Sequence, residues 1–182
     1  MNLKAIAAIP FFFLVSISAS YAAGWVVKTE VDSMTDERTH EAQTVNASGH
    51  SLHIYRLGDG STWITFRLNG KSIEVLGEKP PMMRVDKKEP FDFQLIKDLV
   101  RMNRETFREN PIKVAYRPEP KWVSASVYNG NDLPDRGPIF DLMNGKKVTV
   151  RYYLFTGGYK ETGFPLDGAK EAITKALVGT TR

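Results

Sequence analysis

The sequence predicts an α+β protein, with a mainly antiparallel curved sheet or β-sandwich and two helices packed on it. Apolar and polar residues alternate in many short segments, which is the period of a half-buried β-strand. The period changes to that of an amphipathic helix at about residues 92–107 and again at 166–178. Glycine-rich turns separate neighbouring strand-like segments, which is typical of antiparallel hairpins. A sheet covered by two helices follows from these three observations.

The strand-like segments begin with WVVKTEV, whose first residue, Trp25, we expect in the core. SLHIYRL and STWITFRL are joined by Gly58-Asp59-Gly60, which predicts a tight hairpin. Asn69-Gly70 predicts a second turn leading into a strand at SIEVL, and PPMMRVD predicts a further strand. The alternation of apolar and polar residues that is typical of strands returns in three later segments, IKVAY, WVSASVY and KKVTVRYYLF. The connection between the last two, residues 129–145, has room for one helical turn.

Both predicted helices have a continuous apolar side. In residues 92–107 that side is formed by Phe93, Ile96, Leu99, Val100 and Phe107, and it is widened by Leu95 and Met102. Asp92 is suited to the N-cap, and Asn110-Pro111 marks the end. In the second helix the apolar side is formed by Leu166, Ala169, Ile173, Ala176 and Leu177. Gly179 is placed to follow its last turn.

The first 22 residues have the pattern of a secretory signal peptide. Lys4 precedes an apolar run, and Ser20-Tyr21-Ala22 is a small–x–small cleavage signal. The run is shorter than the roughly 20 residues that a membrane span needs. We therefore expect cleavage after Ala22, a periplasmic location and a single domain at residues 23–182. Loss of the signal lowers the net charge from +4 to +3, which is too small an excess to indicate nucleic-acid binding.

The chain has no cysteine. This excludes a lipid-anchored cysteine, disulfides, thiol catalysis and cysteine-ligated metals. The core alone must therefore stabilise the exported domain.

The segment DSMTD, residues 32–36, is predicted to form a turn in which Asp32 or Ser33 bonds its own backbone. Asp32 and Asp36 supply only two carboxylates, whereas calcium takes roughly six to eight oxygen ligands. We therefore expect a structural turn here and no metal site.

A signal peptide, a tryptophan-led strand and an Asp-x-Met-Thr-Asp turn together resemble small periplasmic proteins associated with type VI secretion. The plan is also similar to that of the invasion-associated locus B proteins. The resemblance continues at RVD, residues 84–86, and at VTVRYY followed by GFPLDGAKEAI. It covers the mature chain in outline and implies an envelope accessory protein. Those proteins usually carry cysteines, unlike this chain, and no catalytic residue can be transferred from them.

Residue patterns for catalysis or for cofactors are weak. His50 and His53 are three apart in an apparent strand, which directs them to opposite faces. No Gly-x-Ser-x-Gly elbow, phosphate-binding loop or dinucleotide fingerprint occurs. Asp132, Asp135 and Asp141 lie in a polar connection downstream of Trp122 and Tyr128. They are the candidate acids of a hydrolase, although a plain loop explains them as well. We expect no cofactor and no metal.

Two surface features are candidate partner contacts. Lys97, Arg101, Arg104 and Arg108 recur at helical spacing opposite the apolar side of the first helix. A glycine-rich stretch at 157–163, predicted to be a mobile loop, carries Tyr159 and Lys160. The stripe is suited to an acidic envelope protein or an anionic envelope surface.

The sequence therefore favours a non-enzymatic periplasmic accessory or binding protein that acts through protein contacts. Two alternatives remain open. One is a small hydrolase of envelope polymers that uses the three aspartates. The other is a β-module that holds a small apolar ligand within its sheet.

Overall fold

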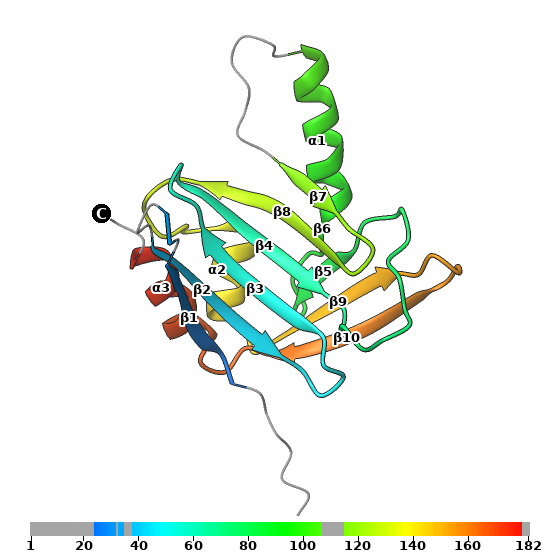
Figure 1. The fold of residues 1–182 in the computed structure, drawn as a ribbon, viewed down its shortest axis with the longest axis horizontal. Coiled ribbons are helices and arrows are strands. Elements are labelled where there is room, and N and C mark those ends of the chain that lie inside the picture. The colour runs from blue at the N-terminus through cyan, green and yellow to red at the C-terminus, as the bar shows by residue number, and fades with distance from the viewer. Residues whose placement is uncertain (1–23, 32, 35–37, 107–114, 180–182) are drawn as a thin grey trace, which may run out of the picture.

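The structure, a computed structural model, describes residues 24–31, 33–34, 38–106 and 115–179, and only the backbone of residues 100–106. This part of the chain forms ten strands and three helices in two antiparallel sheets (Figure 1). The predicted α+β class with a mainly antiparallel sheet is confirmed. The predicted signal peptide, Asp32, Asp36, Phe107, Arg108 and Asn110-Pro111 lie outside the described residues.

The first sheet has six strands in the order β1-β2-β3-β4-β8-β7. Their bounds are β1 Val26–Val31, β2 Arg38–Val45, β3 Ser51–Arg56, β4 Ser61–Arg67, β8 Trp122–Asn129 and β7 Tyr116–Pro118. The predicted hairpin between β3 and β4 is confirmed, because the backbone N–H of Leu57 donates to the Ser61 carbonyl at 2.9 Å. Gly60 has a φ of +85° there, which glycine adopts without steric cost.

The second sheet has four strands in the order β10-β9-β5-β6. Their bounds are β10 Tyr159–Pro165, β9 Lys147–Tyr153, β5 Met82–Val85 and β6 Phe91–Asp92. The prediction of a loop over residues 157–163 was wrong, because most of it is the edge strand β10. Its side chains are mostly exposed, so the apolar alternation that reveals a strand is weak. The strand predicted at SIEVL was also wrong, since only an isolated bridge from Leu76 to Leu154 forms there.

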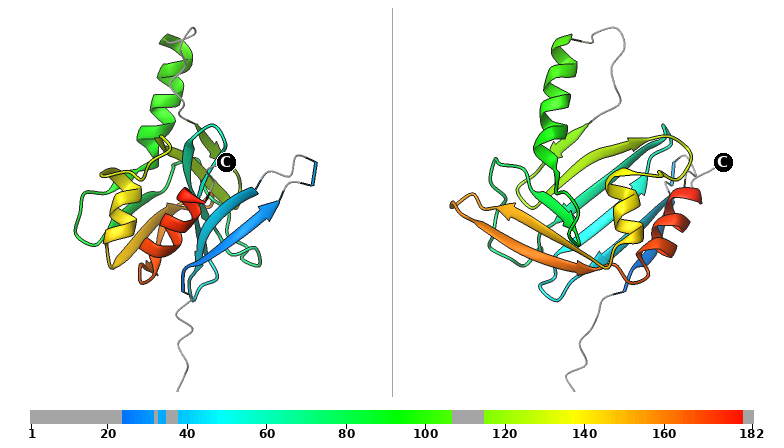
Figure 2. Two further views of the ribbon diagram at one scale, coloured as in Figure 1. Left: turned by 90° about the vertical axis from the view of Figure 1, so that its left-hand side faces the viewer. Right: turned by 180° about the vertical axis from the view of Figure 1, so that it is seen from behind.

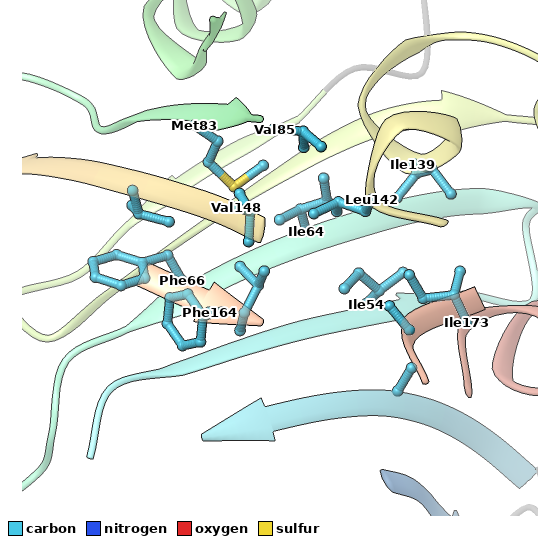
Figure 3. Close-up of a cluster of buried hydrophobic side chains, with 14 of the residues drawn as sticks. Ile54, Ile64, Phe66, Met83, Val85, Ile139, Leu142, Val148, Phe164 and Ile173 are labelled. Carbon is cyan, nitrogen blue, oxygen red and sulfur yellow. The ribbon is translucent and has the colours of Figure 1, made fainter. Parts of the chain in front are cut away.

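The inward faces of both sheets and the helices share one core. Figure 3 shows Ile54, Ile64 and Phe66 of the six-stranded sheet opposite Met83, Val148 and Phe164 of the four-stranded sheet. These side chains are at most 2% exposed. The rings of Phe66 and Phe164 meet edge to face, with centroids 6.4 Å apart. Side chains therefore fill the space between the sheets. A carrier of an apolar ligand would need that space for its ligand.

Helices α2, Gly137–Asn144, and α3, Ala169–Val178, cover the rest of the core. Both lie behind the six-stranded sheet in Figure 1, and α3 packs on β1, β2 and β3. Helix α2 has two turns where one was expected, because Ile139, Leu142 and Met143 are buried at helical spacing. Helix α3 begins at Ala169, after Gly168, whose φ is +78°.

Helix α1, Phe93–Thr106, agrees closely with the predicted range. The Asp92 carboxylate accepts the backbone N–H of Gln94 at 2.8 Å, so the predicted N-cap is confirmed. Of the described side chains on its apolar side, Phe93 and Ile96 are buried, whereas Leu95 and Leu99 are 61% and 44% exposed. The helix packs on the body by its first turn, and the remainder projects outward (Figure 2).

Candidate binding surface

The outer face of the four-stranded sheet carries polar and aromatic side chains. In β9, Val148, Val150 and Tyr152 face the core, so Thr149, Arg151 and Tyr153 face outward. The strand register identifies the neighbours of these three side chains, because paired residues share a face of the sheet. Arg151 lies between Met82 and Glu161, Tyr153 lies beside Tyr159, and Thr149 lies beside Arg84.

Cations and aromatic rings alternate along this face. The Arg151 guanidinium lies 4.7 Å from the centroid of the Tyr159 ring, and Lys79 Nζ lies 4.2 Å from that of Tyr153. The two tyrosine rings are 6.2 Å apart between centroids. We call Lys79, Arg84, Arg151, Tyr153 and Tyr159 the aromatic–basic surface. Lys79 and Arg151 each lie over a tyrosine ring, a position that the ring quadrupole stabilises.

A groove of about 440 Å³ runs along the same face. Its lining is Met82, Met83, Arg84, Asp86, Pro90, Thr149, Arg151 and Glu161. Nε of Arg84 donates to the Lys88 carbonyl at 3.0 Å, which holds the guanidinium at the wall. The Asp86 carboxylate accepts the backbone N–H groups of Lys146 and Lys147, each at 3.0 Å. Both carboxylate oxygens of Asp86 therefore accept hydrogen bonds from the backbone.

The electrostatic balance of this face is positive. Four cations, Lys79, Arg84, Lys147 and Arg151, lie on or beside it with three acids, Asp86, Asp92 and Glu161. Arg151 Nη2 pairs with Glu161 Oε1 at 2.6 Å, and this hydrogen bond raises the pKa of Arg151. Both side chains of that pair are more than 40% exposed, so the pair is weak and opens at little cost. The surface is suited to carboxylate or phosphate groups carried on a partly apolar chain.

The residues predicted as partner contacts do not all lie on one surface of the folded protein. Tyr159 belongs to the aromatic–basic surface. Lys160 points to the other side of β10 and pairs with Glu74. Lys97, on α1, is exposed and donates to the carbonyl of Glu78, the residue before Lys79, at 3.4 Å. Arg101 and Arg104 follow on α1, with their side chains outside the described part.

Sequence reasoning missed Lys79, Arg84, Arg151 and Tyr153. The signal for two of them was present in KKVTVRYYLF, where Arg151 and Tyr153 alternate with the apolar positions. The core face of that strand was predicted, and its outer face was not considered. Arg84 reaches this surface only through the pairing of β5 with β9. Lys79 follows Gly77, whose backbone N–H donates to the Tyr153 carbonyl at 2.8 Å.

Two of the three candidate aspartates, Asp132 and Asp141, contact different side chains. The Tyr128 hydroxyl donates to Asp132 Oδ1 at 2.6 Å, which lowers the pKa of Asp132. Asp141, on α2, pairs with Lys88 at 2.5 Å. Within the described residues, no group of three or more His, Asp or Glu side chains is arranged to hold a metal ion.

His50 and His53 lie on opposite sides of the six-stranded sheet, as the spacing predicted. His50 is 6% exposed and contacts Phe66 and Tyr152 in the core. Its Nδ1 accepts the backbone N–H of Asn69 at 3.0 Å. Burial lowers the pKa of His50, while the nearby Glu74 carboxylate opposes that shift. His53 faces outward and contacts Glu41.

The fold and this surface define an α+β protein with two packed antiparallel sheets and a grooved, cationic outer face. No protein-family model, curated protein or solved structure matches the chain. None of the helices in the described part is both long and apolar enough to cross a membrane.

Proposed function

We propose that the protein is an exported accessory protein of the cell envelope that binds an acidic segment of a partner protein through the aromatic–basic surface. The observation that carries this proposal is the row of cations and tyrosines beside the groove of about 440 Å³. Arginine pairs with carboxylates through two parallel N–H donors, and the tyrosine rings offer apolar area at small entropic cost.

The shape of the site supports a protein segment as the partner. A groove receives an extended chain, with acidic side chains reaching Arg84 and Arg151. A flat anionic surface would meet mainly the protruding side chains. Leu95 and Leu99 on the projecting helix α1 are also exposed and offer apolar area to a partner. The outline resemblance to periplasmic proteins associated with type VI secretion favours the same kind of role.

Crosslinking in intact cells tests the proposal. A C-terminally tagged copy is crosslinked, and captured proteins are identified by mass spectrometry. We expect recovery of one or a few envelope proteins, and loss of that recovery when Lys79 and Arg84 are both changed to glutamate. The matched control changes Lys170 and Lys175, which are exposed on α3, to glutamate and should leave recovery unchanged. Circular dichroism must show that both variants are folded.

A synthetic peptide of the captured partner's acidic segment then gives the affinity in solution. Binding should weaken as salt rises, because exposed charge pairs are screened beyond roughly 10 Å at 0.1 M. Equal recovery by the wild type and the Lys79/Arg84 variant would overturn the proposal. Binding to anionic vesicles without any captured protein would replace the protein partner with a membrane surface.

A further inference from the structure

The outer face of the six-stranded sheet has a second recess, a concavity of about 240 Å³. Register explains which side chains reach it. Ile54, Ile64 and Ala125 lie side by side and face the core, so the next residues along each strand face outward. His53, Thr65 and Ser124 therefore lie in one row on the outer face, and all three line the concavity.

The floor of the concavity is polar. Thr65 and Ser124 are 4% and 2% exposed, and their hydroxyl groups are hydrogen-bonded to each other. One hydroxyl donates its hydrogen in that bond, which leaves one O–H and several lone pairs for a ligand. Longer side chains form the walls, among them Tyr55, Arg67 and Trp122. Buried hydroxyls below half-exposed aromatic rings are typical of small-ligand sites.

A chain of hydrogen bonds fixes one acid in the wall. Ser51 Oγ lies 2.7 Å from His53 Nε2, and His53 Nδ1 lies 2.7 Å from Glu41 Oε1. An ionised carboxylate only accepts, so Nδ1–H donates to Glu41, and Nε2 shares a hydrogen bond with the Ser51 hydroxyl. Both ring nitrogens are then occupied. The second oxygen of Glu41 has no hydrogen-bond partner among the described residues.

This chain has the order of a catalytic serine, histidine and carboxylate, but the arrangement serves a different purpose. Ser51 is only 9% exposed and is not part of the concavity's lining. Its oxygen is therefore not presented to a substrate. The consequence of the chain is a Glu41 carboxylate held in one position in the lining of the recess.

The polar groups of the wall include both donors and acceptors. Arg67 and the Trp122 indole N–H are donors, while Glu30 and Glu41 are acceptors. Within the described part of the chain, neither the Arg67 guanidinium nor the indole N–H has a hydrogen-bond partner. An anion would meet the two carboxylates, and a cation would meet Arg67. Hydroxyl groups both donate and accept, so a neutral polyhydroxylated ligand satisfies the whole set.

We propose that this concavity binds one ring of a neutral sugar. Hydroxyls of the ring donate to Glu41 and accept from Arg67 and Trp122, and its apolar face packs on the aromatic walls. The volume is below the roughly 300 Å³ at which pockets for drug-sized ligands begin, so the occupant is a single ring. The proposal does not depend on the aromatic–basic surface, which lies on the other sheet.

Titration of the purified protein with N-acetylglucosamine and with glucose, followed by ¹H–¹⁵N NMR, tests this site. We expect saturable shifts of backbone amides in β2, β3, β4 and β8 around Glu41, His53, Thr65 and Ser124. The dissociation constant should be on the order of millimolar, because one ring in an open site buries little area. Glu41→Gln, which keeps the size and removes the charge, should weaken binding about tenfold or more.

Trp122→Phe, which removes the indole donor, provides a second variant if Glu41→Gln fails to fold. Lys170→Ala on α3 is the control and should bind sugar as the wild type does. Acetate and glycine serve as an anionic and a zwitterionic probe. Shifts at this face with acetate or glycine but not with sugar would overturn the proposal. Sugar-induced shifts that remain in both site variants, or no shift with either sugar, would overturn it as well.

Discussion

The hydroxyl of Tyr152, on β9, lies 3.3 Å from Nε2 of His50, at the start of β3, and joins the two sheets inside the core. Because Nδ1 of His50 accepts the Asn69 N–H, Nε2 of the neutral ring carries the hydrogen and donates to Tyr152. Tyr152 in turn donates to Glu74 Oε2 at 3.2 Å, and Glu74 pairs with Lys160. Burial raises the pKa of Tyr152 to about 12, so this chain stays neutral at His50 and Tyr152 near pH 7.

The His50 network predicts a loss of stability in mild acid. The pKa of His50 is lowered from 6.5, first by burial, so the unfolded chain takes up the proton before the folded one. The free energy of unfolding is therefore complete above pH 6.5 and falls as the pH drops towards the lower folded pKa. His50→Gln should unfold more easily at pH 7.5 but lose less stability between pH 7.5 and 5.5. Urea unfolding of the wild type and the variant at the two pH values measures the free energy of unfolding. A variant that loses as much stability as the wild type between them would contradict the prediction.

Glu74 predicts a second loss at lower pH. Its pKa is lowered from 4.5, first by the hydrogen bond from Lys160. Its contribution is present above pH 4.5 and is lost as the pH falls through the lower folded pKa. Glu74→Gln should flatten the stability curve below pH 4.5 and leave the step below pH 6.5. An unchanged fall in stability below pH 4.5 in the variant would contradict this prediction.

Substitution of Arg56 is predicted to lower the stability of the fold strongly. It is 4% exposed, and its guanidinium donates to the carbonyls of Asn131, Asp132 and Leu177 at 2.8, 2.6 and 3.1 Å. Arg56→Ala would leave three carbonyls without this donor, of which the Leu177 carbonyl is in a buried hydrogen bond and the other two are in part-buried ones. We expect a loss of at least about 1–3 kcal/mol in denaturant unfolding, the cost of a buried acceptor left unsatisfied. Arg38→Ala, at an exposed position of β2, is the control and should change stability by less than about 0.5 kcal/mol.

Phe164 tests whether the two sheets share one core. It is fully buried and meets Phe66 across the sheets. Phe164→Ala should lower the free energy of unfolding by about 3–5 kcal/mol, through lost burial and a cavity. Phe155→Ala, at a side chain that is 75% exposed, should have an effect of less than about 0.5 kcal/mol. Similar effects of both substitutions would contradict the shared core.

Two positions on helix α1 test how far that helix packs. Ile96 is 8% exposed and Leu99 is 44% exposed, although they are one turn apart. Ile96→Ala should cost about 2–5 kcal/mol, the range for buried aliphatic side chains. Leu99→Ala should cost well under half of that, because alanine keeps helix propensity and little burial is lost. If Leu99→Ala is as costly as Ile96→Ala, the second turn is packed in solution.

Local patterns predicted the hairpin at residues 57–60, the β9 alternation, the Asp92 cap and the range of α1, because each depends on neighbours in the chain. The failures also have a physical cause. β10 is an exposed edge strand that pairs with β9 alone, so its own residues carry little apolar alternation. The alternation in SLHIYRL directs Arg56 to the same face as Ile54, but its three carbonyl partners come from distant segments and leave no local signal.

The sequence by itself determined the α+β class, most strands, both long helices and the absence of thiol chemistry, since composition and periodicity report local burial directly. Only the tertiary structure decided which polar side chains share a face. Arg84 and Arg151 line the same groove because β5 pairs with β9, and Glu41 contacts His53 because β2 pairs with β3. Strand register between segments is set by the packing of the whole core, and both proposed sites depend on that register.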